Sequence, residues 1–493
     1  MPYAKAVLTR SVTSGFLKPR SYTQPRRNLL TLAIETSCDD TAVAILEKES
    51  ITGNLDCDKN QSRDNIVRTN GTVQADPTGP KRTAARLLFN EKVTARNTGH
   101  GGIHPIEALE SHETNLAKLI SKAIISLPDV TLGSSATSRI LRYNNGKLKQ
   151  LPDFVTVTRG PGMRSNLTCG LNTAKGLATA WQVPLLAVHH MQAHALTPRL
   201  VSALEKPIVT TVQNEKQQPR PEFPFLTLLI SGGHTMLLHS KGLVDHTILA
   251  TTRDVAIGDA LDKCGRMILP EDIKSKSKDT AFARDMSSYA FPNPDTYESW
   301  PIPVKRRDEI DKPSNDYNWQ LQTPLAKTKD LAFSFSAIAS SIERIFKERC
   351  EGSGGRVSEE ERLLFARTAL GVAFEQLASR TVIALEMLQR CNEDISTLVA
   401  SGGVAANPFL RYFLRKTLDV RGFEHVQLFF PPPPLCTDNA AMIAWCGMEM
   451  FEAGFRSELD VKAVRKWSMD PAAHDGGIIG VGGWTQGERA STG

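Results

Sequence analysis

Two hairpin-like stretches stand out in the pattern of apolar and polar positions along the chain. Residues 29–46 (LLTLAIETSCDDTAVAIL) place two apolar runs around a small polar turn at 35–40. The plan returns in residues 223–240 (FPFLTLLISGGHTMLLHS), with the turn at 231–234. Such runs, bounded by turn residues, predict β-strands. Any β-hairpin shares this pattern, but two copies about two hundred residues apart predict an internal duplication with a cleft between the halves.

Short strands that lead into glycine turns are the second recurring feature. Residues 153–157 run into RGPGMRSN and a helix over 167–181, and residues 396–407 (STLVASGGVAAN) repeat the arrangement. Glycine lets backbone N–H groups approach an anion, and a helix start favours negative charge. The turns therefore suit a phosphate, although a plain strand–turn–helix connection has the same pattern.

Two segments lack periodic apolar positions. Residues 51–83 are rich in Asn, Asp, Gly and Pro, which predicts a surface insertion or a disordered loop. Residues 270–328 are polar and proline-rich, and we expect an insertion or a mobile lid there. Around them we predict an N-terminal lobe over 29–222, a C-terminal lobe over 223–465 and a tail over 466–493.

Charge is unevenly distributed. Six cations precede the first acidic residue and equal the whole net charge of +6; they are Lys5, Arg10, Lys18, Arg20, Arg26 and Arg27. A basic, hydroxyl-rich and acid-free start is typical of a mitochondrial transit peptide, which we place at residues 1–28. An ordinary disordered tail is the alternative. The remaining chain is close to neutral, so binding to a nucleic acid would need a local basic patch.

Composition excludes several classes of protein. An apolar content of 41% is that of a globular chain, and no run of 18 apolar residues predicts a transmembrane helix. The 8 cysteines form no C-x-x-C pair, which argues against a disulfide framework and against a cysteine zinc knuckle.

Three histidines follow an apolar run in residues 183–195 (VPLLAVHHMQAHA). On a helix, His190 and His194 would share one face, and two imidazoles on one face can ligate a divalent metal. Two polar residues on a half-buried helix are the simpler alternative. No glutamate lies between these histidines, so the H-E-x-x-H pattern of zinc peptidases is missing. His189, one residue out of phase, should point elsewhere.

A candidate carboxylate follows four prolines in PPPPLCTDNAAMIA, residues 431–444. Asp438 precedes an apolar helix expected over 440–447, an N-cap-like position that would aim its carboxylate at a cleft. From this pattern alone, simple helix capping explains the residue better than metal ligation does.

Taken together, these segments resemble one family. The pieces are IETSCDDTAVAI, GPG, VPLLAVHHMQAHA, FPFLTLLISGGHT, GDALDKCGR, FSFS, SGGVAAN and CTDNAAMIA, in family order. On them the chain is identified as a member of the tRNA threonylcarbamoyladenosine synthases, the TsaD/Kae/OSGEP or glycoprotease family. The resemblance implies an α/β fold of duplicated actin/hexokinase/Hsp70-like (ribonuclease H-like) domains with a cleft between them.

The resemblance also implies a site and a reaction. One divalent metal, iron or zinc, would lie on His190, His194 and Asp438. The expected reaction moves a threonylcarbamoyl group from threonylcarbamoyl-AMP to the adenosine just 3′ of the anticodon, in mitochondria. The implied partners are tRNA, a separate synthase that supplies the adenylate, and a second copy of the chain. The implied substrate contacts are Leu229, Ile230, Ser231, Gly232, Gly233, Asp262 and Asn407.

The residue types fit these roles. Backbone N–H groups of the glycine turns can hold the phosphate of the adenylate. Asp262 can accept from both hydroxyls of a ribose. Asp39, in the first turn, can steer the attacking amine or take its proton. One departure concerns the family's Tyr-Pro-Gly-Gly-Pro stretch after the segment matching Asp262, because residues 266–286 contain no glycine pair.

Three alternatives compete with this function. The metal site suits a carbamoyltransferase that acts on a small molecule. An ATP-dependent kinase or switch shares the superfamily, but it has no need of the histidine pair. A metallopeptidase, the family's older description, lacks its glutamate base.

Overall fold

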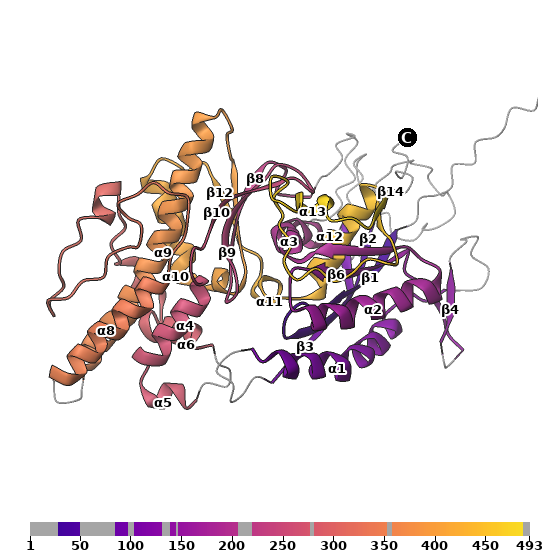
Figure 1. The fold of residues 1–493 in the computed structure, drawn as a ribbon, viewed down its shortest axis with the longest axis horizontal. Helices are drawn as coiled ribbons and strands as arrows, with labels where there is room; N and C mark the ends of the chain where they lie inside the picture. Colours follow the sequence, from indigo (N-terminus) through magenta and orange to yellow (C-terminus); the bar gives the residue numbers. More distant parts are fainter. Residues whose placement is uncertain are drawn as a thin grey trace, which may run out of the picture.

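The chain folds into two lobes, each built on one β-sheet (Figure 1). This computed structural model describes residues 28–49, 84–96, 103–130, 139–143, 146–205, 219–276, 281–352 and 357–486. The predicted transit peptide, apart from Asn28, and the predicted loop at 51–83 lie outside these residues. Among the helices described, none is long and apolar enough to cross a membrane.

The first sheet begins with an antiparallel meander and continues with parallel strands. Strand β1 pairs antiparallel with β2, which pairs antiparallel with β3, while β6 and β7 extend the other side of β1 in parallel. The spatial order is β14 (Trp484–Gln486), β13 (Phe455–Ser457), β7 (Leu185–His189), β6 (Phe154–Gly160), β1 (Leu29–Glu35), β2 (Asp40–Lys48) and β3 (Ala85–Thr94).

The second sheet repeats the same order and strand directions. An antiparallel meander is joined on its first strand by two parallel strands. This repetition confirms the duplicated α/β fold and both hairpins expected from the apolar pattern. The order is β10 (His246–Thr251), β9 (Thr235–Ser240), β8 (Phe225–Ile230), β11 (Thr397–Ser401) and β12 (Gln427–Phe429).

Alternation along β1 gives the first lobe two cores. Leu32 faces one core, and Ala33 faces the other, because successive side chains of a strand point to opposite faces. One core contains residues of α1 (Pro105–Ile125) and α2 (Arg164–Trp181). The opposite core contains residues of α3 (His190–Glu205) and α12 (Ala440–Glu452), so helices cover both faces of the sheet. A small hairpin, β4 (Ile140–Arg142) and β5 (Leu148–Gln150), follows α1.

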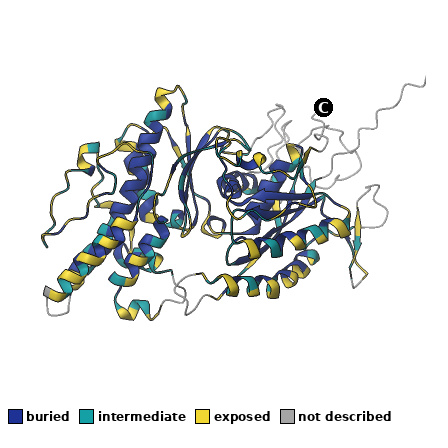
Figure 2. Ribbon diagram, in the orientation of Figure 1, coloured by how far each residue is buried: buried dark blue, intermediate teal, exposed yellow. Residues whose placement is uncertain are grey.

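Helix α3 (His190–Glu205) lies between the two sheets and is buried along most of its length (Figure 2). Its Ala193 packs in the core of the first lobe. Its Met191 packs in a cluster with Leu229 of β8 and Leu238 of β9. This helix therefore carries the predicted metal ligands into the region where the two lobes meet.

The second lobe places its helices around one large core, which Leu226, Leu228 and Ile230 of β8 enter. The segment predicted as an insertion or lid belongs to this core, since Met286 and Trp319 are buried in it. The helices are α4 (Ile257–Ile268), α5 (Glu271–Lys274), α6 (Phe282–Ala290), α7 (Pro294–Glu298), α8 (Ser336–Gly352), α9 (Glu359–Arg390) and α10 (Pro408–Val420), with short 3-10 helices η1 (Arg306–Glu309) and η2 (Gly403–Ala406).

The predicted lobe boundaries need a correction at the C-terminal end. After α11 (Pro433–Cys436) the chain returns to the first lobe, where α12 (Ala440–Glu452) packs on β1 and β2. Strands β13 and β14 then extend the first sheet, and α13 (Gly477–Gly480) lies between them in the chain. Helix α12 is apolar on nearly all sides, so its composition indicated burial but not which sheet would bury it.

Candidate metal centre and cleft

The histidine pair lies at the junction between β7 and α3. Strand β7 ends at His189 and α3 begins at His190, which places the rings of His190 and His194 on one side with centroids 4.8 Å apart. The side chain of His189 caps the new helix, because its Nδ1 accepts hydrogen bonds from the N–H groups of Met191 (3.1 Å) and Gln192 (3.4 Å). Its Nε2 faces the carbonyl oxygen of Trp467 at 3.1 Å.

His189 is therefore a structural residue, as its phase predicted. Burial lowers its pKa to about 3, so the ring stays neutral and its Nδ1 remains an acceptor.

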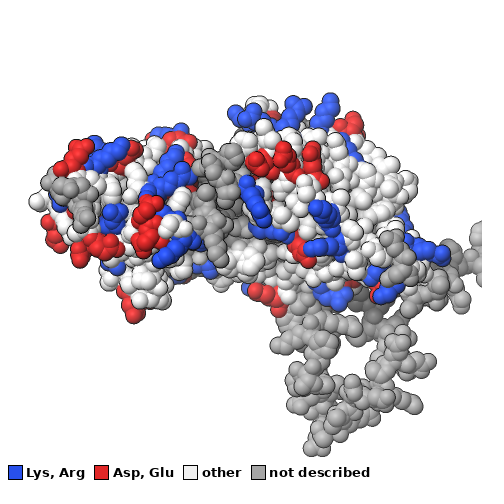
Figure 3. Space-filling model, turned by 90° about the horizontal axis from the view of Figure 1, so that it is seen from below, with Lys and Arg blue, Asp and Glu red and all other residues white. Residues whose placement is uncertain are grey.

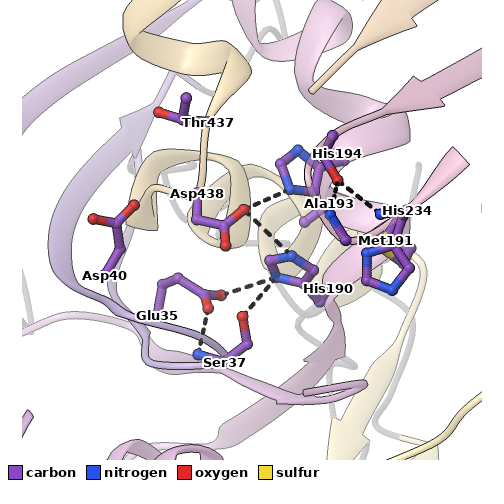
Figure 4. Close-up of polar contacts among 12 residues, drawn as sticks. Glu35, Ser37, Asp40, His190, Met191, Ala193, His194, His234, Thr437 and Asp438 are labelled. Atoms are coloured by element: carbon purple, nitrogen blue, oxygen red, sulfur yellow. Dashed lines mark hydrogen bonds and ion pairs between the residues drawn. The ribbon is translucent and has the colours of Figure 1, made fainter. Parts of the chain in front are cut away.

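Asp438 completes the group from the other end of the chain (Figure 4). Its Oδ1 lies 2.9 Å from Nε2 of His194 and 3.4 Å from Nε2 of His190. One ligand atom from each of the three residues lies within 4.8 Å of the other two. The convergence expected for His190, His194 and Asp438 is present. The N-cap of α12 is not Asp438 but Asn439, whose side chain accepts from the N–H of Met442 at 3.0 Å, so the carboxylate of Asp438 faces the histidines.

A second carboxylate supports the centre from behind. Glu35 at the end of β1 is fully buried, and its Oε2 lies 3.3 Å from Nδ1 of His190. The N–H of Ser37 donates to Oε1 of Glu35 at 2.6 Å, and the hydroxyl of Thr158 donates to Oε2. Nδ1 of His190 also lies 3.2 Å from the hydroxyl oxygen of Ser37. A carboxylate on Nδ1 leaves the lone pair of Nε2 free to face a metal.

The charges of the group favour a cation at its centre. Burial alone lowers the pKa of His190, but the carboxylates of Asp438 and Glu35 outweigh burial and raise this pKa to about 10. Burial alone raises the pKa of Asp438, whereas His190 and His194 hold it well below its ordinary value. Two imidazoles and one carboxylate are a common ligand set for zinc and for non-haem iron. These residues therefore fit a divalent metal.

Metal binding at this centre should depend on pH. With a pKa of about 10, His190 is protonated near neutral pH when no metal is bound, and the ion must displace that proton. We expect the apparent metal affinity to rise by up to about tenfold per pH unit from pH 6 to 9, and to level off above about pH 10. Chelator competition at several pH values measures it; an affinity independent of pH would contradict the assignment of His190.

The turn between β8 and β9 lies beside this centre. Burial, and then the positive charge of His190 and of His194, lowers the pKa of His234 to about 4, which leaves this imidazole neutral. The hydroxyl of Ser231 accepts from the N–H groups of Gly233 (3.3 Å) and His234 (3.0 Å). A Cβ added to Gly233, or to the neighbouring Gly232, would meet no atom within 4 Å, so these backbones face open space.

Two other glycines bring α4 and η2 against this turn. The N–H of Gly258 in α4 donates to the carbonyl of Ser231 at 3.2 Å, and a Cβ on Gly258 would lie 2.8 Å from Cα of Gly232. Gly402, just before η2, has a φ of +101°, and a Cβ there would lie 2.3 Å from the carbonyl oxygen of Ile230. Two glycine turns and the glycine-containing start of α4 therefore meet at one place in the second lobe.

Substitution of Gly402 by alanine should destabilise the second lobe. The added Cβ would overlap a backbone oxygen that cannot rotate away, at a φ that L-residues rarely adopt. We expect a loss of roughly 3 kcal/mol in the free energy of unfolding, measured by urea denaturation. Gly403→Ala is the matched control, because a Cβ there meets nothing within 4 Å. Equal losses in both variants would contradict this explanation.

Asp262 and Asn407, both predicted substrate contacts, are joined through α6. Oδ1 of Asp262 accepts from the N–H of Ala283 at 2.7 Å, and Nδ2 of Asn407 donates to the hydroxyl of Ser287 at 2.8 Å. The Oδ1 of Asn407 caps α10. Burial raises the pKa of Asp262. Residues 277–280, just before α6 and within the stretch that departs from the family pattern, lie outside the described residues.

The remaining predicted residues differ in their surroundings. Leu229 and Ile230 are buried in β8, so only their backbone atoms remain for contact with a ligand. Asp39 is half-buried in the loop after β1, where burial and then the charge of Asp40 raise its pKa. The charge of Asp438 also acts on Asp39, which places this carboxylate within electrostatic reach of the metal centre.

Comparison with known proteins agrees with this geometry. The family profile described as tRNA N6-adenosine threonylcarbamoyltransferase matches residues 87–445. The chain belongs to this threonylcarbamoyltransferase family. A mitochondrial tRNA N6-adenosine threonylcarbamoyltransferase of Schizosaccharomyces pombe is 35% identical over 466 residues, which cover 93% of this chain and 89% of that protein.

Bacterial members of the threonylcarbamoyltransferase family align over a similar length. The protein of Cereibacter sphaeroides is 30% identical, over 92% of this chain and 98% of its own length. The protein of Zymomonas mobilis is 28% identical, over 92% of this chain and 95% of its own length. The relatives therefore span nearly all of the structure described above.

Two residues around the candidate metal centre, Glu35 and Lys92, are not predicted from the sequence of this family member. The apolar pattern places Glu35 in a polar turn, although an acidic residue at the end of an apolar strand signals a carboxylate held at a sheet edge. Lys92 of β3 joins the loops around the site, because its Nζ donates to Asp40 (2.7 Å), to Thr437 (3.1 Å) and to the carbonyl of Asp438 (3.1 Å). Nothing in the local pattern distinguishes Lys92 from other exposed lysines.

Proposed function

We propose that this protein transfers a threonylcarbamoyl group from threonylcarbamoyl-AMP to the exocyclic amine of the adenosine immediately 3′ of the anticodon. The tRNAs would be those that read codons beginning with adenine. The observation that supports this most is the convergence of His190, His194 and Asp438 in a chain whose family profile spans residues 87–445. The leader composition and the name of the relative from S. pombe support mitochondria, and we place the protein in the matrix.

The donor is a mixed anhydride that is already activated, so the protein chiefly has to hold it and orient the amine. A divalent metal, iron or zinc, held by His190, His194 and Asp438 would polarise the donor carbonyl. The exposed backbones of Gly232, Gly233 and Gly403 would donate N–H groups to the phosphate, stabilising its charge as AMP leaves.

In the transfer, the amine nitrogen forms a bond to the carbamoyl carbon, and the bond from that carbon to the phosphate oxygen breaks. The amine loses one proton, for which Asp39 is our proposed acceptor. A raised pKa near the reacting groups suits a carboxylate to this role. We assign the ribose hydroxyls of the donor to the free oxygen of Asp262, and a further substrate contact to Asn407.

Partners follow from this chemistry. The adenylate must come from a separate synthase that joins threonine, bicarbonate and ATP. We further propose that the protein works as a homodimer.

A reconstituted assay tests the function. Purified protein, loaded with iron or zinc, is given threonylcarbamoyl-AMP and an unmodified tRNA transcript, and mass spectrometry of the nucleosides detects the modified adenosine. Small-molecule amines, and sugars with ATP, serve as competing substrates. Modification of a small amine but not of tRNA would identify a small-molecule carbamoyltransferase instead. Phosphorylation of a sugar would identify a kinase instead. In cells, loss of the protein should remove the modified nucleoside from mitochondrial tRNA.

A further inference from the structure

A strip of positive side chains borders the metal centre on the first lobe. Lys462, Arg465 and Lys466 are exposed in the segment after β13, and Arg164 is exposed at the start of α2. We call these four residues the basic rim.

The backbone of this strip is firmly attached to the first lobe. Nε of Arg159 donates to the carbonyl of Lys462 at 3.1 Å, and the N–H of Gly162 donates to the carbonyl of Arg465 at 3.2 Å. The ring of Trp467 packs on His189, with centroids 4.6 Å apart. The backbone of this strip is therefore hydrogen-bonded within the first lobe, while the charged side chains remain exposed to solvent.

The same contacts place the rim beside the reacting groups. The N–H of Met163, next to Arg164, donates to the carbonyl of Ser37 at 2.9 Å, and the hydroxyl oxygen of Ser37 lies 3.2 Å from Nδ1 of His190. Gly162, which bonds to Arg465, would place a Cβ 2.6 Å from the same carbonyl of Ser37. The rim therefore adjoins the loop after β1, which also carries Asp39, the proposed proton acceptor.

Within the part of the chain that the structure describes, the positive charge of the rim is not offset by ion pairs. None of its four side chains forms an ion pair with another described residue, whereas many other cations of the described chain do so. Arg159 lies beneath it at 5% exposure, and its Nη1 has no hydrogen-bond partner among the described residues. Asp460 is the acidic residue that acts on Arg159. On the face in Figure 3, positive and negative side chains are interspersed over both lobes.

We propose that the basic rim binds the sugar–phosphate backbone of the tRNA next to the adenosine that enters the cleft. This inference rests on the proposed function and deepens it by assigning a tRNA-binding surface. A chain that is nearly neutral without its leader must bind a polyanion through a restricted set of cations, and unpaired Lys and Arg side chains suit phosphates.

The test neutralises three charges of the rim together. The variant Lys462→Gln/Arg465→Gln/Lys466→Gln is compared with a charge-matched control, Arg142→Gln/Lys327→Gln/Lys329→Gln. The control residues are exposed and form no ion pair with another described residue. A fluorescent unmodified tRNA transcript is titrated by anisotropy at several salt concentrations. Metal content and the melting temperature of each protein show that it is folded.

We expect the rim variant to bind tRNA at least about tenfold more weakly near 0.1 M salt, with a salt slope shallower by two to three units. The control should bind within about twofold of the natural chain, and a donor analogue should bind all three proteins alike. Unchanged tRNA affinity and slope in the rim variant, or equal losses in the control, would overturn the inference. If the natural chain binds no tRNA at all, the proposed function fails instead.

Discussion

Asp438→Asn is expected to release the metal and to lower the rate of transfer by roughly a thousandfold. The neutral amide is a poor ligand, and it also removes the charge that balances His190 and His194. A metal acting as a Lewis acid supplies several kcal/mol of transition-state stabilisation, and each 1.36 kcal/mol corresponds to a factor of ten in rate.

Two measurements separate this effect from misfolding. Metal per subunit is determined by mass spectrometry of the purified variant, and the melting temperature is compared with that of the metal-depleted natural chain. Thr437→Ala is the control, because the hydroxyl of this neighbour accepts a hydrogen bond from Lys92 and faces neither histidine, so this variant should retain the metal. A variant at Asp438 that keeps a full complement of metal would show that the ion lies elsewhere.

Glu35→Gln is expected to weaken metal binding by about 10-fold to 100-fold, although Glu35 does not face the ion. The carboxylate accepts from Ser37 and from Thr158 and lies against Nδ1 of His190. The glutamine amide has the same shape but replaces one acceptor oxygen with an NH2 donor. This NH2 group either faces the N–H of Ser37, donor against donor, or lies against Nδ1 of His190 and favours the tautomer that carries its proton on Nε2.

The natural and substituted proteins are compared by chelator competition at one pH, with circular dichroism to monitor folding. Asp40→Asn offers a matched carboxylate at the start of β2, since Asp40 bonds to Lys92 and Thr94 but, among the described residues, to neither His190 nor His194. The metal affinity of this control should stay within about threefold of that of the natural chain. This change is smaller than the loss expected when a carboxylate that orients a ligand is removed. Equal affinities in the Glu35 variant and the natural chain would mean that Glu35 serves folding alone.

Patterns that span only a few residues of the sequence determined the local features of this protein, namely its hairpins and the side chains that share a helix face. The apolar runs around the turns at 35–40 and 231–234 predicted two hairpins, since strand alternation and turn residues are local properties. The spacing of His190 and His194 predicted one shared face for the same reason. The phase of His189 alone predicts that its side chain points away from the other two histidines.

Neighbouring positions can be ambiguous even at this level. Asp438 and Asn439 both suit a helix N-cap, and the structure uses Asn439. A shift of one residue changes the role of Asp438 from cap to candidate ligand. The apolar pattern does not resolve helix ends to that accuracy.

Tertiary structure decided what lies together in the centre. Asp438 and His194 are 244 residues apart, and Glu35 and His190 are 155 apart. Resemblance to a family supplied Asp438, but only the order of strands β1, β6 and β7 places Glu35 behind His190. Helix α12 is apolar on nearly all sides, which indicates that it is buried but not which lobe buries it. Local periodicity determines which face of an element is apolar, whereas packing between distant elements determines which faces meet.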